Sequence, residues 1–149
     1  MQISEHFTLA ELTVTNQPFA NTPNEVEIAN LKTLADKVLE PIRRHFGAVR
    51  VNSGFRSARV NAAVGSKSTS QHRVGEAGDI EVPGVPNPVL AMWIRDNLAF
   101  DQLILENYRP GVAGSGWVHV SYRTGRLRQK SMTMKMGSHG PVYSNGINV

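Results

Sequence analysis

The longest regular pattern of apolar and polar positions lies in the first third of the chain. Apolar residues recur every three or four positions among mostly charged ones, which predicts an amphipathic helix that Gly47 terminates. Thr22 is expected as its N-cap, with Pro23 in the first turn and Glu25 closing a capping box. Pro41 lies inside the pattern and predicts a kink or a break. The apolar face consists of Leu31, Leu34, Ala35, Val38 and Ile42.

Shorter patterns predict the remaining elements. Strands are expected over 49–53, 79–82, 101–106, 116–122 and 128–136, where apolar residues alternate or form short runs. Short helices are expected over 8–12, 57–64 and 87–98. Because strands and helices do not alternate regularly, the order predicts an α+β domain with a central antiparallel sheet flanked by helices rather than a doubly wound sheet.

The chain length of 149 residues fits one domain with a single core. Within it we expect an N-terminal helical part over about 1–48, a sheet part over about 49–136 and a loosely held, turn-rich tail over about 137–149. Hydrophobic residues make up 40% and charged residues 19% of the chain, which excludes an intrinsically disordered protein. We expect a monomer.

Charge and cysteine content narrow the classes of function. A net charge of +4 and an isoelectric point near 9.8 favour polyanionic surroundings such as nucleic acid, anionic lipid or bacterial envelope polymers. The absence of cysteine excludes disulfides, thiolate nucleophiles and cysteine-bound zinc. The sequence shows neither a signal-peptide pattern at its start nor the ~18–20 apolar residues of a membrane span. We therefore expect a soluble protein without membrane insertion.

Two histidines and an aspartate have the composition of a hydrolytic metal site. Such a zinc site uses three protein ligands and one open position, here either three histidines or two histidines and a carboxylate. His72 and Asp79 stand seven residues apart with glycines between them, which suits a loop that folds back rather than one helical face. His119 lies on a predicted strand, where Trp117 and His119 point to one face and their neighbours to the other.

The pattern Ser-x-His-x-x-Gly-x-Ala-x-Asp over residues 70–79, followed by Trp-x-His at 117–119, resembles the zinc D-alanyl-D-alanine carboxypeptidase and endolysin superfamily, which has the hedgehog/DD-peptidase fold. The segments 53–57 and 100–106 also look like this family, so the resemblance covers roughly 49–122. The start of the chain, residues 4–12, looks like compact single-domain phage members of the group.

The resemblance implies that His72, Asp79 and His119 bind Zn²⁺ and that Arg56 holds the oxyanion or the substrate carbonyl. The remaining candidates are weaker. Ser70 and Gln71 are candidates for hydrogen bonds to substrate or to the ligands, and Trp117 is a candidate for lining the substrate groove, with core packing as the alternative.

The general base is the position at which the sequence departs from the family pattern. Many members have an acidic residue three positions before the second histidine, where this chain has Gly116. A base is still required to take a proton from water and pass it to the leaving amine. Glu106, at the end of the preceding strand, is the preferred candidate, and the alternatives are Asp101, Glu76 and Glu81.

Other chemically active side chains carry no function at this stage. His6 and His45 have helical or capping surroundings, and His139 lies in a glycine-flanked turn. The alternating methionines at 132, 134 and 136 are interpreted as one packed face of a strand rather than a metal or cofactor site.

The resemblance implies hydrolysis of peptidoglycan stem peptides at a D-Ala, L-Ala–D-Glu or D-Ala–diaminopimelate bond. With the composition, it suggests a phage endolysin made in the host cytoplasm without a signal peptide and acting on the cell wall after release. One alternative is a zinc-containing wall-binding or virion-associated module with little turnover, which the glycine at position 116 favours. A nucleic-acid-binding domain rests on charge alone, because no helix-turn-helix or aromatic-rich basic sheet is evident.

Overall fold

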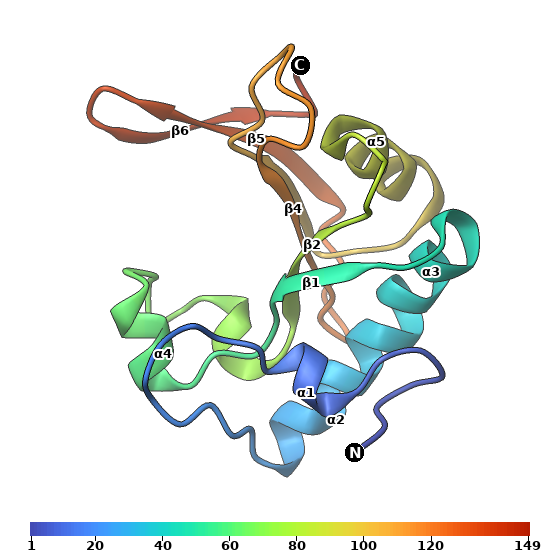
Figure 1. Ribbon diagram of the computed structural model, residues 1–149, viewed down its shortest axis with the longest axis vertical. Helices are drawn as coiled ribbons and strands as arrows, with labels where there is room; N and C mark the ends of the chain where they lie inside the picture. The colour runs from blue at the N-terminus through green and yellow to red at the C-terminus, as the bar shows by residue number, and fades with distance from the viewer.

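The computed structural model describes all 149 residues and shows an α+β fold in which helices pack against a single sheet (Figure 1). The α+β expectation is thus confirmed. The helices are α1 (Leu9–Leu12), α2 (Glu25–Leu34), the π-helical turn η1 (Ala35–Leu39), α3 (Glu40–Phe46), α4 (Ala58–Ala63), the 3-10 turn η2 (Gln71–Val74) and α5 (Asn87–Asn97). The strands are β1 (Arg50–Ser53), β2 (Ala77–Glu81), β3 (Gln102–Glu106), β4 (Trp117–Ser121), β5 (Lys130–Gly137) and β6 (Gly140–Asn145).

The six strands form a mixed sheet in the order β1-β2-β4-β3-β5-β6. All neighbours are antiparallel except β3 and β5, so the expectation of an antiparallel sheet is wrong at this pair. The cause is the connection 122–129, which turns the chain back after β4 and carries it past the beginning of β3. Strand β5 therefore opposes β4 in direction but lies beside β3, to which it is parallel.

The core lies between the helices and one face of the sheet. In Figure 1, α2, α3 and α5 lie on one side of the sheet, whereas α4 and the β5–β6 hairpin project on the other. Alternate residues of the central strands enter the core, which leaves the intervening residues on the opposite face. Fully buried members of the core include Leu31, Leu34, Val38, Ile80, Leu103, Leu105, Val118 and Val120.

The long N-terminal helical segment is interrupted where proline predicted a break. Pro41 has no N–H and its ring excludes the carbonyl group four residues earlier, so the hydrogen-bond ladder is displaced. The N–H of Glu40 bonds to Ala35 O, a step of five residues, which defines the π-helical turn η1. The helix begins two residues later than expected: Asn24, not Thr22, is the N-cap, and its side chain and Glu27 form a reciprocal capping box.

The segment 137–149, expected as a loose tail, contains a strand. Strand β6 pairs antiparallel with β5 from Met132 to Gly137, and the two form an exposed hairpin at the edge of the sheet. Thr133 anchors the end of the chain, because its hydroxyl donates to Gly146 O and accepts from the N–H of Asn148.

Asp101 holds the connection that places β5. Its side chain is fully buried and accepts hydrogen bonds from Arg126 at 2.9 Å and from Arg128 at 2.8 Å, and also from the amide of Gln71 at 2.9 Å. Burial opposes ionisation of Asp101, but the hydrogen bonds from Arg128 and Arg126 outweigh it and hold the pKa well below its usual range.

We expect Asp101→Asn to lower the free energy of unfolding by about 2 kcal/mol at pH 7, because the amide leaves both guanidinium groups without a negative partner. The pKa in the folded state is below the unfolded value of about 4, so this contribution is present above that pH and is lost as the pH falls through the folded-state pKa. When unfolding by urea is measured in the presence of EDTA, the difference in the free energy of unfolding between wild type and variant should narrow below about pH 4. A gap independent of pH would contradict the ionic explanation.

Candidate metal centre and active site

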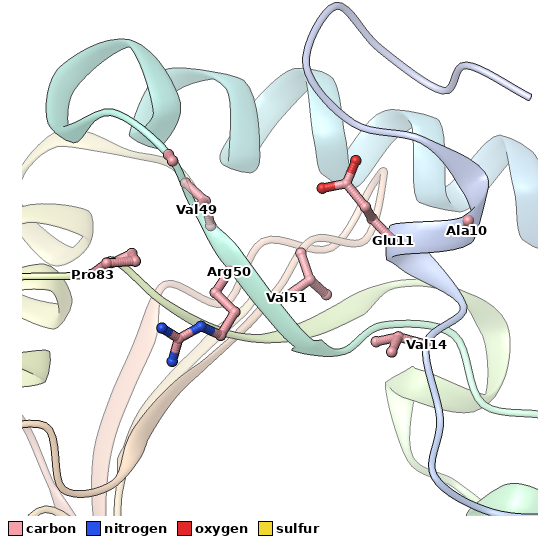
Figure 2. Close-up of a pocket in the computed structure, with 8 residues that line it drawn as sticks. Ala10, Glu11, Val14, Val49, Arg50, Val51 and Pro83 are labelled. Carbon is pink, nitrogen blue, oxygen red and sulfur yellow. The ribbon is translucent and has the colours of Figure 1, made fainter.

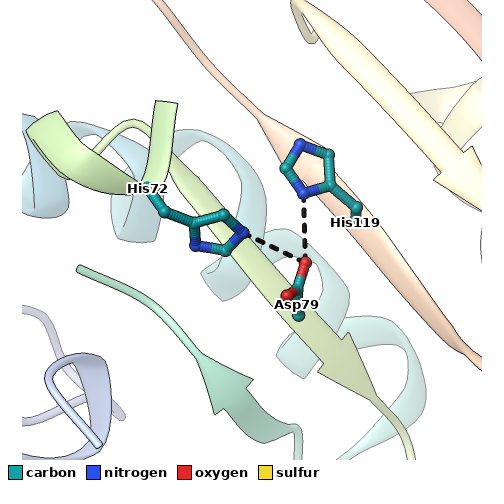
Figure 3. Close-up of side chains that lie close together, drawn as sticks. All are labelled: His72, Asp79 and His119. Carbon is teal, nitrogen blue, oxygen red and sulfur yellow. Dashed lines mark hydrogen bonds and ion pairs between the residues drawn. The ribbon is translucent and has the colours of Figure 1, made fainter. Parts of the chain in front are cut away.

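Three side chains from separate elements converge on the sheet face opposite α2 and α5 (Figure 3). His72 comes from η2, Asp79 from β2 and His119 from β4. Asp79 Oδ1 lies 3.2 Å from His72 Nε2 and 3.0 Å from His119 Nδ1. The register of β2 and β4 pairs Asp79 directly with His119, so only His72 has to be brought in by a loop.

The loop that delivers His72 depends on one glycine. Ser70 caps η2 by accepting a hydrogen bond from the N–H of His72 at 3.2 Å. Gly75 ends the turn in the left-handed region with φ +80°, and a Cβ there would lie 2.6 Å from Glu27 O. The chain can thus reverse into β2 only with glycine at this position.

The hydrogen-bond partner of His72 determines which ring nitrogen faces the centre. Nδ1 lies 2.7 Å from Gly54 O, an atom that can only accept, so Nδ1 carries the hydrogen. In the neutral ring, Nε2 then presents a lone pair to Asp79 Oδ1, which is also an acceptor. Two acceptors at this distance require a proton or a metal cation between them.

Charges around Asp79 keep it ionised despite its burial. Burial opposes ionisation, but the neighbouring His72 and His119 outweigh it and hold the pKa of Asp79 far below its ordinary value. Burial acts to lower the pKa of His119, yet the hydrogen bond to Asp79 raises it overall. Arg56 Nη2 contacts the second oxygen, Oδ2, at 3.2 Å, and Arg56 Nε donates to Ser53 Oγ at 2.9 Å. These two bonds leave Nη1 of Arg56 without a protein partner.

Glu106 shares the face of the sheet that carries the three clustered side chains. It ends β3, two residues after Ile104, which is the cross-strand partner of His119. Trp117 Nε1 donates to Glu106 Oε2 at 2.7 Å and orients the carboxylate. Burial raises the pKa of Glu106, with a smaller opposing effect from His119.

The alternative bases are held in other contacts. Asp101 is enclosed with two arginines at the start of β3. Glu76 accepts from the amide of Gln71 at 3.3 Å, and Glu81 accepts from that of Asn52 at 2.8 Å. These contacts favour Glu106 among the carboxylates predicted from the sequence.

Gly116 explains the departure from the expected acidic position. It has φ +73°, and a Cβ there would overlap Glu106 O and lie 2.7 Å from Tyr108 N. No side chain fits without displacing the backbone where β3 and β4 diverge. Gly116 thus packs against the backbone of Glu106, the preferred candidate for the base.

The remaining predicted residues have the following places. Gln71 does not point freely into the site, because its amide binds Glu76 and Asp101. Ser70 caps η2, and Trp117 binds Glu106. Two contributors, the Ser53 hydroxyl and the Gly54 carbonyl, were missed as site residues, although both lie in the Ser-Gly-Phe-Arg segment that carried the resemblance.

The model of the Peptidase M15 family matches residues 5–121, which contain every residue of the cluster described above. The chain belongs to this family of zinc metallopeptidases. A comparison with curated proteins gives no significant match. The match ends before β5, so the β5–β6 hairpin of this M15 peptidase lies outside the part that the family model describes.

The three clustered residues fit zinc as a donor set. The ligand atoms of His72, Asp79 and His119 lie within 4.8 Å of one another, and two imidazoles with one carboxylate form a hydrolytic zinc set with an open position. The Gly54 carbonyl provides the outer hydrogen bond that typically orients a histidine ligand. Two carboxylates, Asp79 and Glu106, face one guanidinium group, which favours binding of a cation.

An apolar pocket of this M15 peptidase lies elsewhere, between α1 and β1 (Figure 2). Its volume is about 580 Å³, and its lining is mostly apolar, including Val14, Val49 and Val51. Its charged members, Glu11 and Arg50, provide no metal-binding set. We place the candidate metal site at the His–Asp–His cluster because ligand geometry, rather than volume, determines where a metal binds.

No helix has the length and hydropathy needed to cross a membrane.

We expect Gly116→Ala to lower the free energy of unfolding by about 3 kcal/mol, because left-handed strain adds to the clash with Glu106. Gly114→Ala is a matched control: its φ is +77°, but nothing lies within 4 Å of the added Cβ. This control should lose only about 1 kcal/mol. Equal losses in urea unfolding would show that the close approach at Gly116 is unimportant.

Proposed function

We propose that this M15 peptidase hydrolyses peptide bonds in peptidoglycan stem peptides with zinc held by His72, Asp79 and His119. The observation that carries the proposal is the His72–Asp79–His119 cluster, in which the Gly54 carbonyl leaves His72 Nε2 facing a carboxylate across 3.2 Å. Zinc bound there would supply Lewis acidity that polarises the scissile carbonyl and makes water more acidic.

Glu106 is proposed as the general base and then the general acid. It removes a proton from the attacking water as the new C–O bond forms, and it returns that proton to the amine nitrogen as the C–N bond breaks. Burial raises its pKa, which brings it closer to the neutral range where proton transfer in both directions is efficient. Trp117 holds the carboxylate in place with its N–H.

Arg56 is proposed to stabilise the negative charge that develops on the carbonyl oxygen. Its side chain is 15% exposed and fixed by Ser53 and by Asp79 Oδ2. Because Nη1 has no protein partner, it is free to donate to substrate from a preorganised position. A charged donor fixed before the reaction lowers the barrier without reorganisation.

The basic character of the chain supports action on an anionic cell wall. With a net charge of +4, the protein would be retained near wall or envelope polymers by electrostatic attraction. We propose a phage endolysin that reaches peptidoglycan after release from the host cytoplasm.

Purified peptidoglycan incubated with the zinc-loaded protein should yield new peptide termini, identified by mass spectrometry, and EDTA should abolish them. The identity of the new termini shows which peptide bond the protein cuts. Bound zinc without new termini would refute hydrolysis and support the wall-binding alternative.

We expect Glu106→Gln to keep one zinc per chain and to lower kcat by about 10²- to 10⁴-fold, because the amide cannot accept the water proton. Glu81→Gln is the matched control, since Glu81 belongs to the same sheet but is held by Asn52 and Asn87. It should keep nearly full activity. Zinc content by atomic absorption and kcat on released stem peptides measure the two effects, and an active Glu106→Gln enzyme would exclude Glu106 as the base.

A further inference from the structure

The β5–β6 hairpin extends the catalytic face of the sheet beyond Glu106. Met134 on β5 is the cross-strand partner of Glu106, and Tyr143 on β6 is the partner of Met134. Cross-strand partners point to the same face, and each strand adds ~4.8 Å, so Tyr143 begins ~10 Å from Glu106 on the side away from the metal ligands. Figure 1 shows the hairpin projecting past the rest of the sheet.

The residues that β5 and β6 pair on this face are uncharged and mostly apolar, whereas Lys130 lies on the same face at the beginning of β5, before the pairing with β6 starts. Tyr143 is 53% exposed and Met136 is 57% exposed, whereas Met134 between Tyr143 and Glu106 is only 6% exposed. Burial raises the pKa of Tyr143, and the charge of Glu106 adds to the effect, which is consistent with the short span between them. Strand alternation and register place on this face Met132, Met134, Met136, Pro141, Tyr143 and Asn145.

The proposed role of Glu106 fixes which part of a substrate would lie on this surface. A general acid must reach the departing nitrogen, so the leaving amine lies next to Glu106. The residue that carries this amine extends away from the metal ligands, and the next surface on that side is the hairpin face. An apolar surface continuous with a catalytic carboxylate is thus positioned to contact the leaving-side residue of the peptide.

We propose that Tyr143, with Met134 and Met136, forms the subsite for the leaving-side residue of the substrate and selects an uncharged, alanine-like side chain there. This inference rests on the proposed peptidase function. The aromatic ring and the adaptable thioethers provide contact area for a small apolar side chain. An acidic side chain, such as that of D-glutamate, would meet Glu106 with no cation beside Met134, Met136 or Tyr143 to compensate, because Lys130, the cation of this face, stands four residues before Met134 along β5.

Binding can be tested apart from turnover in the zinc-loaded Glu106→Gln protein. The probes are two synthetic stem-peptide fragments that are identical except for D-alanine or D-glutamate on the leaving side. By calorimetry, Tyr143→Ala should weaken binding of the D-alanine peptide about tenfold, because the aromatic contact is lost. The preference for D-alanine over D-glutamate depends on the charge of Glu106 and is therefore measured as kcat/KM in the Glu106-containing enzyme. Val142→Ala is the matched control, because Val142 is the adjacent, 60% exposed residue on the opposite face of β6. It should leave binding unchanged.

A second pair of variants tests the selection by charge in the Glu106-containing enzyme. Met136→Lys places a cation on the hairpin face, and Val142→Lys places one at a similarly exposed position on the other face. The quantity measured is kcat/KM for the D-glutamate peptide divided by kcat/KM for the D-alanine peptide. Only Met136→Lys should raise this ratio, by about tenfold. Both substitutions are at exposed sites, so folding should be retained.

The outcomes separate this inference from the proposed function. If the enzyme cleaves the peptides but Tyr143→Ala does not change binding, the subsite is overturned and the peptidase function stands. The same holds if the enzyme cleaves the D-glutamate peptide in preference to the D-alanine peptide. Tyr143-dependent binding without cleavage by the wild type supports the subsite and overturns hydrolysis. Neither binding nor cleavage overturns both.

Discussion

The carboxylate of Asp79 is the point on which the site is built. One of its oxygens faces the imidazoles of His72 and His119, and the other contacts Arg56. A buried carboxylate is costly unless its charge is compensated, so each of these neighbours offsets the cost of burying Asp79. The hydrogen bond from His72 Nδ1 to Gly54 O fixes the orientation of the ring and leaves Nε2 facing Asp79. The protein's own contacts thus hold the three side chains of the candidate metal site in place.

Crowding between β3 and β4 explains why position 116 is a glycine. The backbone at Gly116 approaches that of Glu106 so closely that only glycine fits, so the acidic side chain that the family resemblance leads one to expect there has no room. The same pairing aligns Glu106 with Trp117, whose N–H holds the carboxylate. One close contact between the two strands thus excludes a side chain at position 116 and lies next to the pair formed by Glu106 and Trp117.

The connection after β4 has a similar double effect. Its arginines bind the buried Asp101 and guide the chain past the start of β3, so that β5 pairs parallel with β3. This pairing places Met134 beside Glu106 and lets the hairpin extend the catalytic face. An ion pair remote from the metal ligands therefore decides which surface adjoins the proposed base.

Local chemistry made much of the fold and of the metal site predictable from the sequence. The break at Pro41 and strand alternation depend on neighbouring residues, and the donor types of His72, Asp79 and His119 restrict the metal chemistry of any fold that joins them. The parallel position of β5, the strand at 140–145 and the clash at Gly116 depend on contacts between segments far apart in the chain. Periodicity records which residues of a strand share a face, but not which strand lies beside it. Only the tertiary structure could therefore place Met134 and Tyr143 in line with Glu106, because that alignment is a property of strand pairing.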